Sequence, residues 1–194
     1  MLFIVAAVIM LLHFLFHPVR LFGMDTSIFY MDEKVTLTAW FTTVVYFFAA
    51  AIAFLSPRNL PRIGMGIFFL LLSLDEYFEI HEYINTLLKT IVAKETLAGS
   101  LFHFSWIFPF TILIAAIFFS FFLTAKREPN KRLKKLLLIG LSMYGAILVM
   151  ELVGGLTYGL PIYVVMVGVE EGLEMFSAVI FLRYMLQSSK LFTA

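Results

Sequence analysis

The chain has 194 residues, of which 62% are hydrophobic and 14% are charged, whereas a soluble domain is about 45–50% apolar and about 25% charged. This excess of apolar residues is too large for one core in water, so the composition predicts a protein that is solvated by a lipid bilayer. The formal net charge of +1 gives no field for binding nucleic acid, and the absence of cysteine excludes disulfides, thiolate metal sites and cysteine-bound clusters.

Six apolar segments have about the length that crosses a bilayer, roughly 17–25 residues. In chain order they lie near 2–17, 37–56, 62–84, 101–125, 135–157 and 160–186. The third and sixth segments are interrupted by carboxylates, so their hydropathy is weaker than that of the others. Alternation of polar and apolar residues over ten-residue stretches is absent from the sequence, which argues against transmembrane strands. We therefore predict an all-α polytopic membrane protein, a single domain over 1–194 that forms a bundle of six transmembrane helices.

Basic residues indicate how this bundle is oriented. The segment "KREPNKRLKK" at 126–135 holds six of the fourteen lysines and arginines, and Arg58, Arg62 and Arg183 fall on the same side if all six segments cross. Cytoplasmic loops carry the excess of lysine and arginine. The prediction is an N-in/C-in topology with the basic loop in the cytoplasm.

Carboxylates and imidazoles recur near one depth in the outer half of this predicted bundle. A charged carboxylate at the centre of a bilayer costs about 2.5 kcal/mol or more, and no lysine or arginine is predicted at that depth. The acidic groups must therefore share protons or bind a cation. Asp75, Glu79 and Glu82 are spaced i, i+4, i+7 and are predicted to share one helix face. Glu170 and Glu174 form a second i, i+4 pair.

These residues define a candidate metal site. The primary candidates are Asp75, Glu76, Glu79, His81, Glu82, Glu151, Glu170, Glu171 and Glu174, and the secondary candidates are His13, His17 and His103. Oxygen and imidazole ligands suit a divalent or non-haem metal such as Fe, Zn or Mn. Ferritin-like di-iron bundles add a Glu-x-x-His motif, which this sequence lacks.

The preferred functional hypothesis is a membrane metal-binding protein, as a metalloenzyme or oxidoreductase if it is an enzyme. Three alternatives remain open from the residues alone. The carboxylates suit a proton- or cation-coupled transporter. The histidines suit a b-type haem protein. A structural subunit of a larger membrane complex would use the same groups as hydrogen-bonded spacers between helices.

The motif "SLDEYFEIHE" and the later "VEEGLEMF" together resemble a group of uncharacterised small polytopic bacterial membrane proteins. That group combines Asp-Glu and His-Glu in a middle helix with Glu-Glu-x-x-Glu in a late one. The resemblance implies a multi-pass protein of the inner membrane and carries no activity with it. The partners expected are the lipid bilayer and either a second copy of the chain or a membrane complex, and not nucleic acid.

Overall fold

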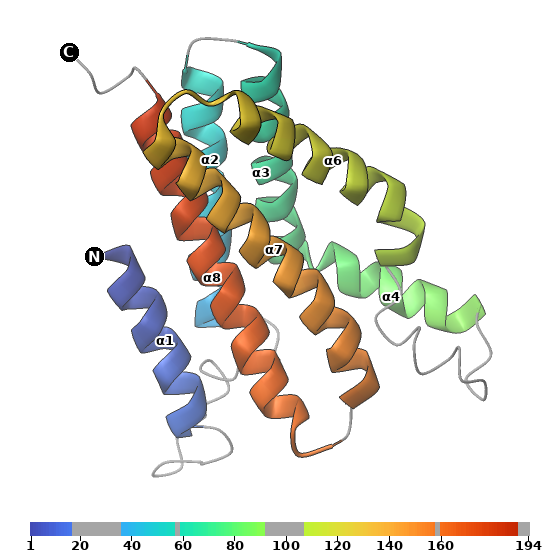
Figure 1. Cartoon of the computed structure of the whole chain (residues 1–194). Coiled ribbons are helices and arrows are strands. Elements are labelled where there is room, and N and C mark those ends of the chain that lie inside the picture. The colour runs from blue at the N-terminus through green and yellow to red at the C-terminus, as the bar shows by residue number, and fades with distance from the viewer. Residues whose placement is uncertain (17–35, 57–58, 92–106, 158–159, 190–194) are drawn as a thin grey trace.

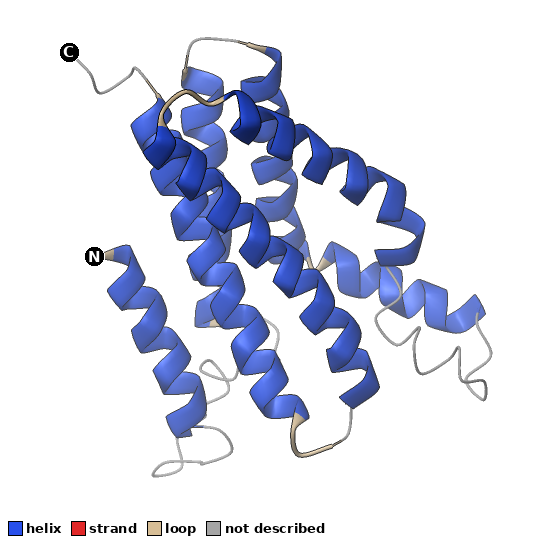
Figure 2. Cartoon of the chain, in the orientation of Figure 1, coloured by secondary structure: helices blue, strands red, loops and turns tan. Residues whose placement is uncertain are grey.

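The computed structural model describes residues 1–16, 36–56, 59–91, 107–157 and 160–189. The fold is all-α, as predicted, and the described residues form seven helices (Figures 1 and 2). In chain order they are α1 (Leu2–Phe16), α2 (Leu37–Leu55), α3 (Leu60–Phe78), α4 (Ile80–Ile91), α6 (Ile107–Arg127), α7 (Lys131–Thr157) and α8 (Tyr163–Ser188).

Three helices in the described part of the chain are long and apolar enough to cross a membrane. They contain the stretches Leu37–Leu55, Phe110–Arg127 and Lys131–Gly154, and α1 is a shorter apolar helix. Large apolar side chains also cover the outside of the molecule: Phe47 is 53% exposed and Phe119 is 62% exposed. A soluble monomer rarely exposes large contiguous apolar patches, so this surface fits a lipid environment.

Local sequence signals explain where α2 and α3 begin. The side chain of Thr36 accepts a hydrogen bond from the Ala39 amide, and the side chain of Asn59 accepts one of 2.9 Å from the Arg62 amide. Both are preferred N-cap residue types, and Pro61 suits the first turn of a helix. The short connection from α2 to α3 forms an antiparallel pair, and α7 packs against α8 in the same way.

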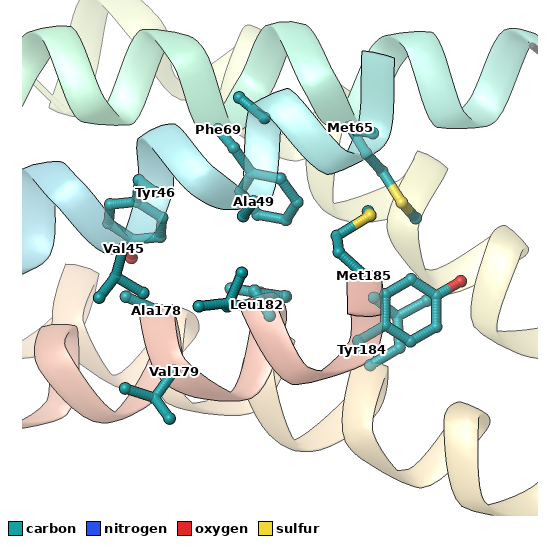
Figure 3. Close-up of a cluster of buried hydrophobic side chains, with 14 of the residues drawn as sticks. Val45, Tyr46, Ala49, Met65, Phe69, Ala178, Val179, Leu182, Tyr184 and Met185 are labelled. Atoms are coloured by element: carbon teal, nitrogen blue, oxygen red, sulfur yellow. The ribbon is translucent and has the colours of Figure 1, made fainter. Parts of the chain in front are cut away.

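The main core lies between α2, α3, α6, α7 and α8 (Figure 3). Phe69 is fully buried at its centre, and its ring lies 5.2 Å from that of Phe181 and 6.2 Å from that of Tyr46. Small residues such as Ala49 on α2 allow the helices to approach closely. Tyr46 belongs both to this core and to the polar cavity described below, so it marks where the apolar packing ends.

The first helix packs on α8 at two glycines spaced as in a Gly-x-x-x-Gly motif. A Cβ atom added to Gly168 would lie 2.6 Å from the Phe14 ring and 2.9 Å from the His13 ring, and one added to Gly172 would lie 2.8 Å from the Met10 sulfur. Such spacing lets two membrane helices approach closely. The rings at Gly168 have less freedom to move than the flexible Met10 side chain at Gly172.

This contact predicts that Gly168→Ala destabilises the protein. Overpacking a close contact costs about 1–3 kcal/mol, because the rings of His13 and Phe14 must move. Gly64→Ala is the matched control, since Gly64 lies in helix α3 and its added Cβ meets no atom within 4 Å; there alanine stabilises a helix by about 0.4–1 kcal/mol. Unfolding in mixed detergent measures both variants. Equal stability of the two would show that α1 does not depend on this contact.

One predicted helix is wrong. The segment 62–84 was expected to be continuous, but it breaks at Glu79, which adopts a left-handed conformation with φ 52° and separates α3 from α4. In Figure 1, α4 leaves the end of α3 and runs away from the bundle. The expectation that Asp75, Glu79 and Glu82 share a helix face therefore fails. The other segments are helical where the structure describes them, and α7 begins at Lys131, before the predicted start at 135. Residues 101–106 of the predicted fourth segment lie outside the described residues.

Candidate functional site

A small polar cavity lies between five helices. Its volume is about 20 Å³, and it is lined by Tyr46 of α2, Leu72, Asp75 and Glu76 of α3, His81 of α4, Tyr144, Ile147, Leu148 and Glu151 of α7, and Glu174 of α8. A space of about 10–15 Å³ measured with a water-sized probe holds one water molecule, so this cavity has room for one water or one small ion. None of the lysines and arginines in the described ranges lines it. The cavity thus brings together acidic groups from distant parts of the chain.

Asp75 and His81 form the ion pair at the edge of this cavity. The Asp75 Oδ2 atom lies 2.9 Å from His81 Nδ1, and Asp75 Oδ1 accepts a 2.9 Å hydrogen bond from the His81 backbone N–H. Asp75 therefore acts as a cap for the first turn of α4 from six residues upstream. This geometry needs the chain reversal at Glu79, because a continuous helix would turn His81 away from Asp75. The left-handed conformation costs about 1–2 kcal/mol, and the two Asp75 hydrogen bonds offset that cost.

The same pairing sets the charge of His81, which lies on α4 outside the long apolar helices. Burial disfavours the charged imidazole, but the hydrogen bond and the charge of Asp75, together with the charges of Glu151 and Glu174, prevail and raise the pKa of His81 to about 10. The side chains of His81 and Asp75 remain 29% and 27% exposed. At neutral pH His81 is therefore an imidazolium that is hydrogen-bonded to Asp75.

The remaining acidic groups are arranged as carboxyl pairs. Glu76 shares a side-chain hydrogen bond with Glu174, and Glu151 shares one with Glu170. A hydrogen bond between two carboxyl groups needs a proton from one of them, because an ionised carboxylate can only accept hydrogen bonds. Glu170 does not line the cavity itself but adjoins it through Glu151. These pairs account for how several acids are tolerated between apolar helices.

Two tyrosines complete the site, and the sequence analysis did not single them out. The Tyr46 hydroxyl lies 3.1 Å from the Ser177 hydroxyl, which itself lies 3.1 Å from the backbone carbonyl of Glu174. Tyr144 also lines the cavity. Its spacing of i, i+7 from Glu151 was the available signal, because residues so spaced share a helix face. Tyr46 lies within an apolar stretch of α2, and a buried tyrosine hydroxyl usually has a polar partner.

Several predicted candidates do not join the cavity. Glu79 forms the break between helices, Glu82 is exposed on α4, and Glu171 is absent from the lining. His13 is fully buried against α8, where its Nε2 atom lies 3.4 Å from the Val164 carbonyl oxygen. His17 and His103 lie outside the described residues.

The present side-chain arrangement is not that of a closed metal centre. Across the described ranges, no three acidic or imidazole side chains stand close enough together to hold a metal ion. The five acidic and imidazole groups that line the cavity are instead engaged in one ion pair and in carboxyl pairs.

Comparison with known proteins identifies a family. The model of a family described as "Domain of unknown function (DUF8692)" matches residues 1–188. No curated protein and no solved structure matches the chain.

Proposed function

The chain belongs to the DUF8692 family, and we propose that it is a multi-pass membrane protein that binds one divalent or non-haem metal ion, Fe, Zn or Mn, in the cavity between α3, α4, α7 and α8. One observation carries the proposal. Asp75, Glu76, His81, Glu151 and Glu174 line a single space of about 20 Å³, and no lysine or arginine of the described part of the chain lines it with them. Oxygen and imidazole donors of this kind are the ligands that these metals prefer.

The donor set fits a metal on chemical grounds, and binding one would require its side chains to rotate together. The carboxyl groups of Glu76 and Glu174 already face each other across a shared hydrogen bond. A cation bound between them would replace the proton that they share, because metal ligands must be deprotonated. A metal bound in this way would act as a Lewis acid that activates water or polarises a substrate oxygen.

In the proposed membrane arrangement six helices cross the inner membrane: α1, α2, α3, α6, α7 and α8. The start of α1 and the end of α8 both lie on the cytoplasmic side. Figure 1 has the connections from α2 to α3 and from α6 to α7 at the same end of the bundle as the end of α8. Arg62 at that end donates to Ser188 over 2.9 Å. Basic residues therefore gather there, which supports the orientation. Helix α4, with 12 residues, reaches about 18 Å, too short for a crossing of about 30 Å.

Metal stoichiometry tests the proposal. The full-length protein, purified in detergent and equilibrated separately with Fe²⁺, Zn²⁺ and Mn²⁺, is expected to retain about one equivalent of one of these ions after gel filtration, as measured by elemental analysis. The variants His81→Ala and Glu174→Gln are expected to retain much less metal. A folded protein that retains none of the three metals would overturn the proposal.

A second candidate function is proton-coupled transport, and one specific observation favours it. The carboxyl groups of Glu76 and Glu174, and those of Glu151 and Glu170, lie within hydrogen-bonding reach of each other between apolar helices, and acidic groups in such positions form proton relays in transporters. The stoichiometry experiment separates the two candidates when it is joined to a flux assay. Proton uptake into liposomes without any bound metal would favour transport over a metal site.

A further inference from the structure

An apolar groove lies beside the polar cavity, between α3, α4, α6 and α7. Its volume is about 200 Å³, and most of the residues that line it are apolar, such as Leu71, Ile84, Ile114, Ile117 and Phe118. Ligand pockets for drug-sized molecules occupy about 300–1,000 Å³. The groove is therefore sized for one hydrocarbon chain and not for a whole two-chain lipid.

The groove and the polar cavity meet at shared walls. Asp75, His81 and Tyr144 line both spaces, together with Leu72 and Leu148. Among the described residues that line the groove, these three have the hydrogen-bonding side chains, and all three lie on the side shared with the cavity. A molecule in the groove would thus place its apolar part against α6 and its polar end beside the proposed cation site.

We propose that this groove binds the hydrocarbon chain of a membrane lipid whose uncharged oxygen head, a hydroxyl or a quinone-type carbonyl, meets Asp75, His81 and Tyr144. The inference rests on the proposed function in one respect, because the lipid bound in the groove would be the substrate of the proposed metal site. An apolar pocket with a few convergent polar groups is the usual form of a ligand site.

Charge selects the head group. The acidic groups Glu76, Glu151 and Glu174 stand behind the polar end of the groove, and they disfavour a phosphate or a fatty-acid carboxylate at that end. A cationic amine would need a carboxylate partner, but the Asp75 carboxyl group is already paired with His81, at 2.9 Å from its Nδ1 atom. A neutral oxygen can donate to or accept from the Tyr144 hydroxyl without adding charge.

Photolabelling tests this inference on the full-length protein in detergent. Three probes carry the same diazirine-labelled sixteen-carbon chain and differ only in the head: a primary alcohol, a benzoquinone and a carboxylate. The alcohol, the quinone or both are expected to label groove residues at least tenfold more than the carboxylate does. The two arms separate a long-chain alcohol from a quinone as the source of the head group.

A matched pair of variants locates the binding. Ile114→Trp fills the groove and is expected to lower specific labelling at least tenfold. Ile112→Trp places the same side chain on the same helix at a position that is 85% exposed and does not line the groove, so labelling should be unchanged. Metal content is measured in parallel and should be equal in both variants.

The outcomes are decisive in both directions. Equal labelling by the carboxylate probe, equal labelling of the two tryptophan variants, or no labelling of groove residues would each overturn the inference, because ordinary surrounding lipid would give those results. If Ile114→Trp loses labelling and the protein binds no metal, the lipid-binding groove is supported and the metal site is rejected. The two proposals can therefore fail separately.

Discussion

Glu174→Gln is expected to weaken divalent-metal binding by more than the roughly 10–100-fold that loss of an outer-shell partner costs a metal site. Glu174 lines the cavity, shares a hydrogen bond with Glu76 and feels the charge of His81. Glutamine has the same shape and keeps a neutral hydrogen bond, but it cannot supply a negative charge to a cation. The measurement is a competition titration against a chelator at pH 7.

The control for this prediction is Glu82→Gln, which removes the same charge from the exposed face of α4. Its metal affinity should stay within about twofold of the unaltered protein, because exposed charges are strongly screened. Glu151→Gln should resemble Glu174→Gln, since Glu151 lines the cavity from the opposite helix. If Glu82→Gln and Glu174→Gln weaken binding equally, the metal is held by general surface charge and the cavity is not its site.

The helices that sequence reasoning located well are those set by local composition. The boundaries of α1 and α2 follow from apolar runs that end near prolines or capping residues, and they agree with the structure within one residue. The meeting of Asp75 and Glu76 with Glu151 and Glu174 was also predictable, because buried acids in separate apolar helices need one another or a cation. Depth along each helix, counted from the basic end, was enough to place them in one layer.

The local geometry at Glu79 was not predictable from the same patterns. Left-handed conformations favour glycine, and nothing in "DEYFEIHE" signals one. The break is stabilised by a contact between two helices, in which the Asp75 side chain caps the first turn of α4 at His81, six residues later. Periodicity treats the segment as one helix and so turns His81 away from the site, whereas the break turns it inward. The close packing at Gly168 and Gly172 was likewise not predicted, because acidic residues are the conspicuous feature of the sequence at 168–174.

Asp75→Ala is expected to lower the free energy of unfolding by about 3 kcal/mol at pH 6, of which about 1 is the lost helix cap and about 2 the lost hydrogen bond to a charged group. Both atoms of the Asp75 carboxylate are engaged with His81, at 2.9 Å each. Their loss leaves the imidazolium facing the cavity without its partner and frees the start of α4. Unfolding in mixed detergent, with metal removed by a chelator, measures the change, and increased hydrogen exchange across Ile80–Asn85 locates it.

The dependence of this loss on pH separates the charge from the cap. Against the opposing effect of burial, Asp75 and the charges of Glu151 and Glu174 raise the pKa of His81 from 6.5 to about 10. The contribution of His81 to stability is therefore complete below pH 6.5 and disappears as the pH rises through 10. The difference between the unaltered protein and Asp75→Ala should therefore shrink over that range towards the cap alone. Asp75→Asn keeps an oxygen for the His81 amide but has no charge, so its stability should lie between the two at pH 6 and match the unaltered protein near pH 10. A loss in Asp75→Ala that stays constant from pH 6 to pH 10 would show that the imidazole is not charged by Asp75, and that capping alone holds α4 at the cavity.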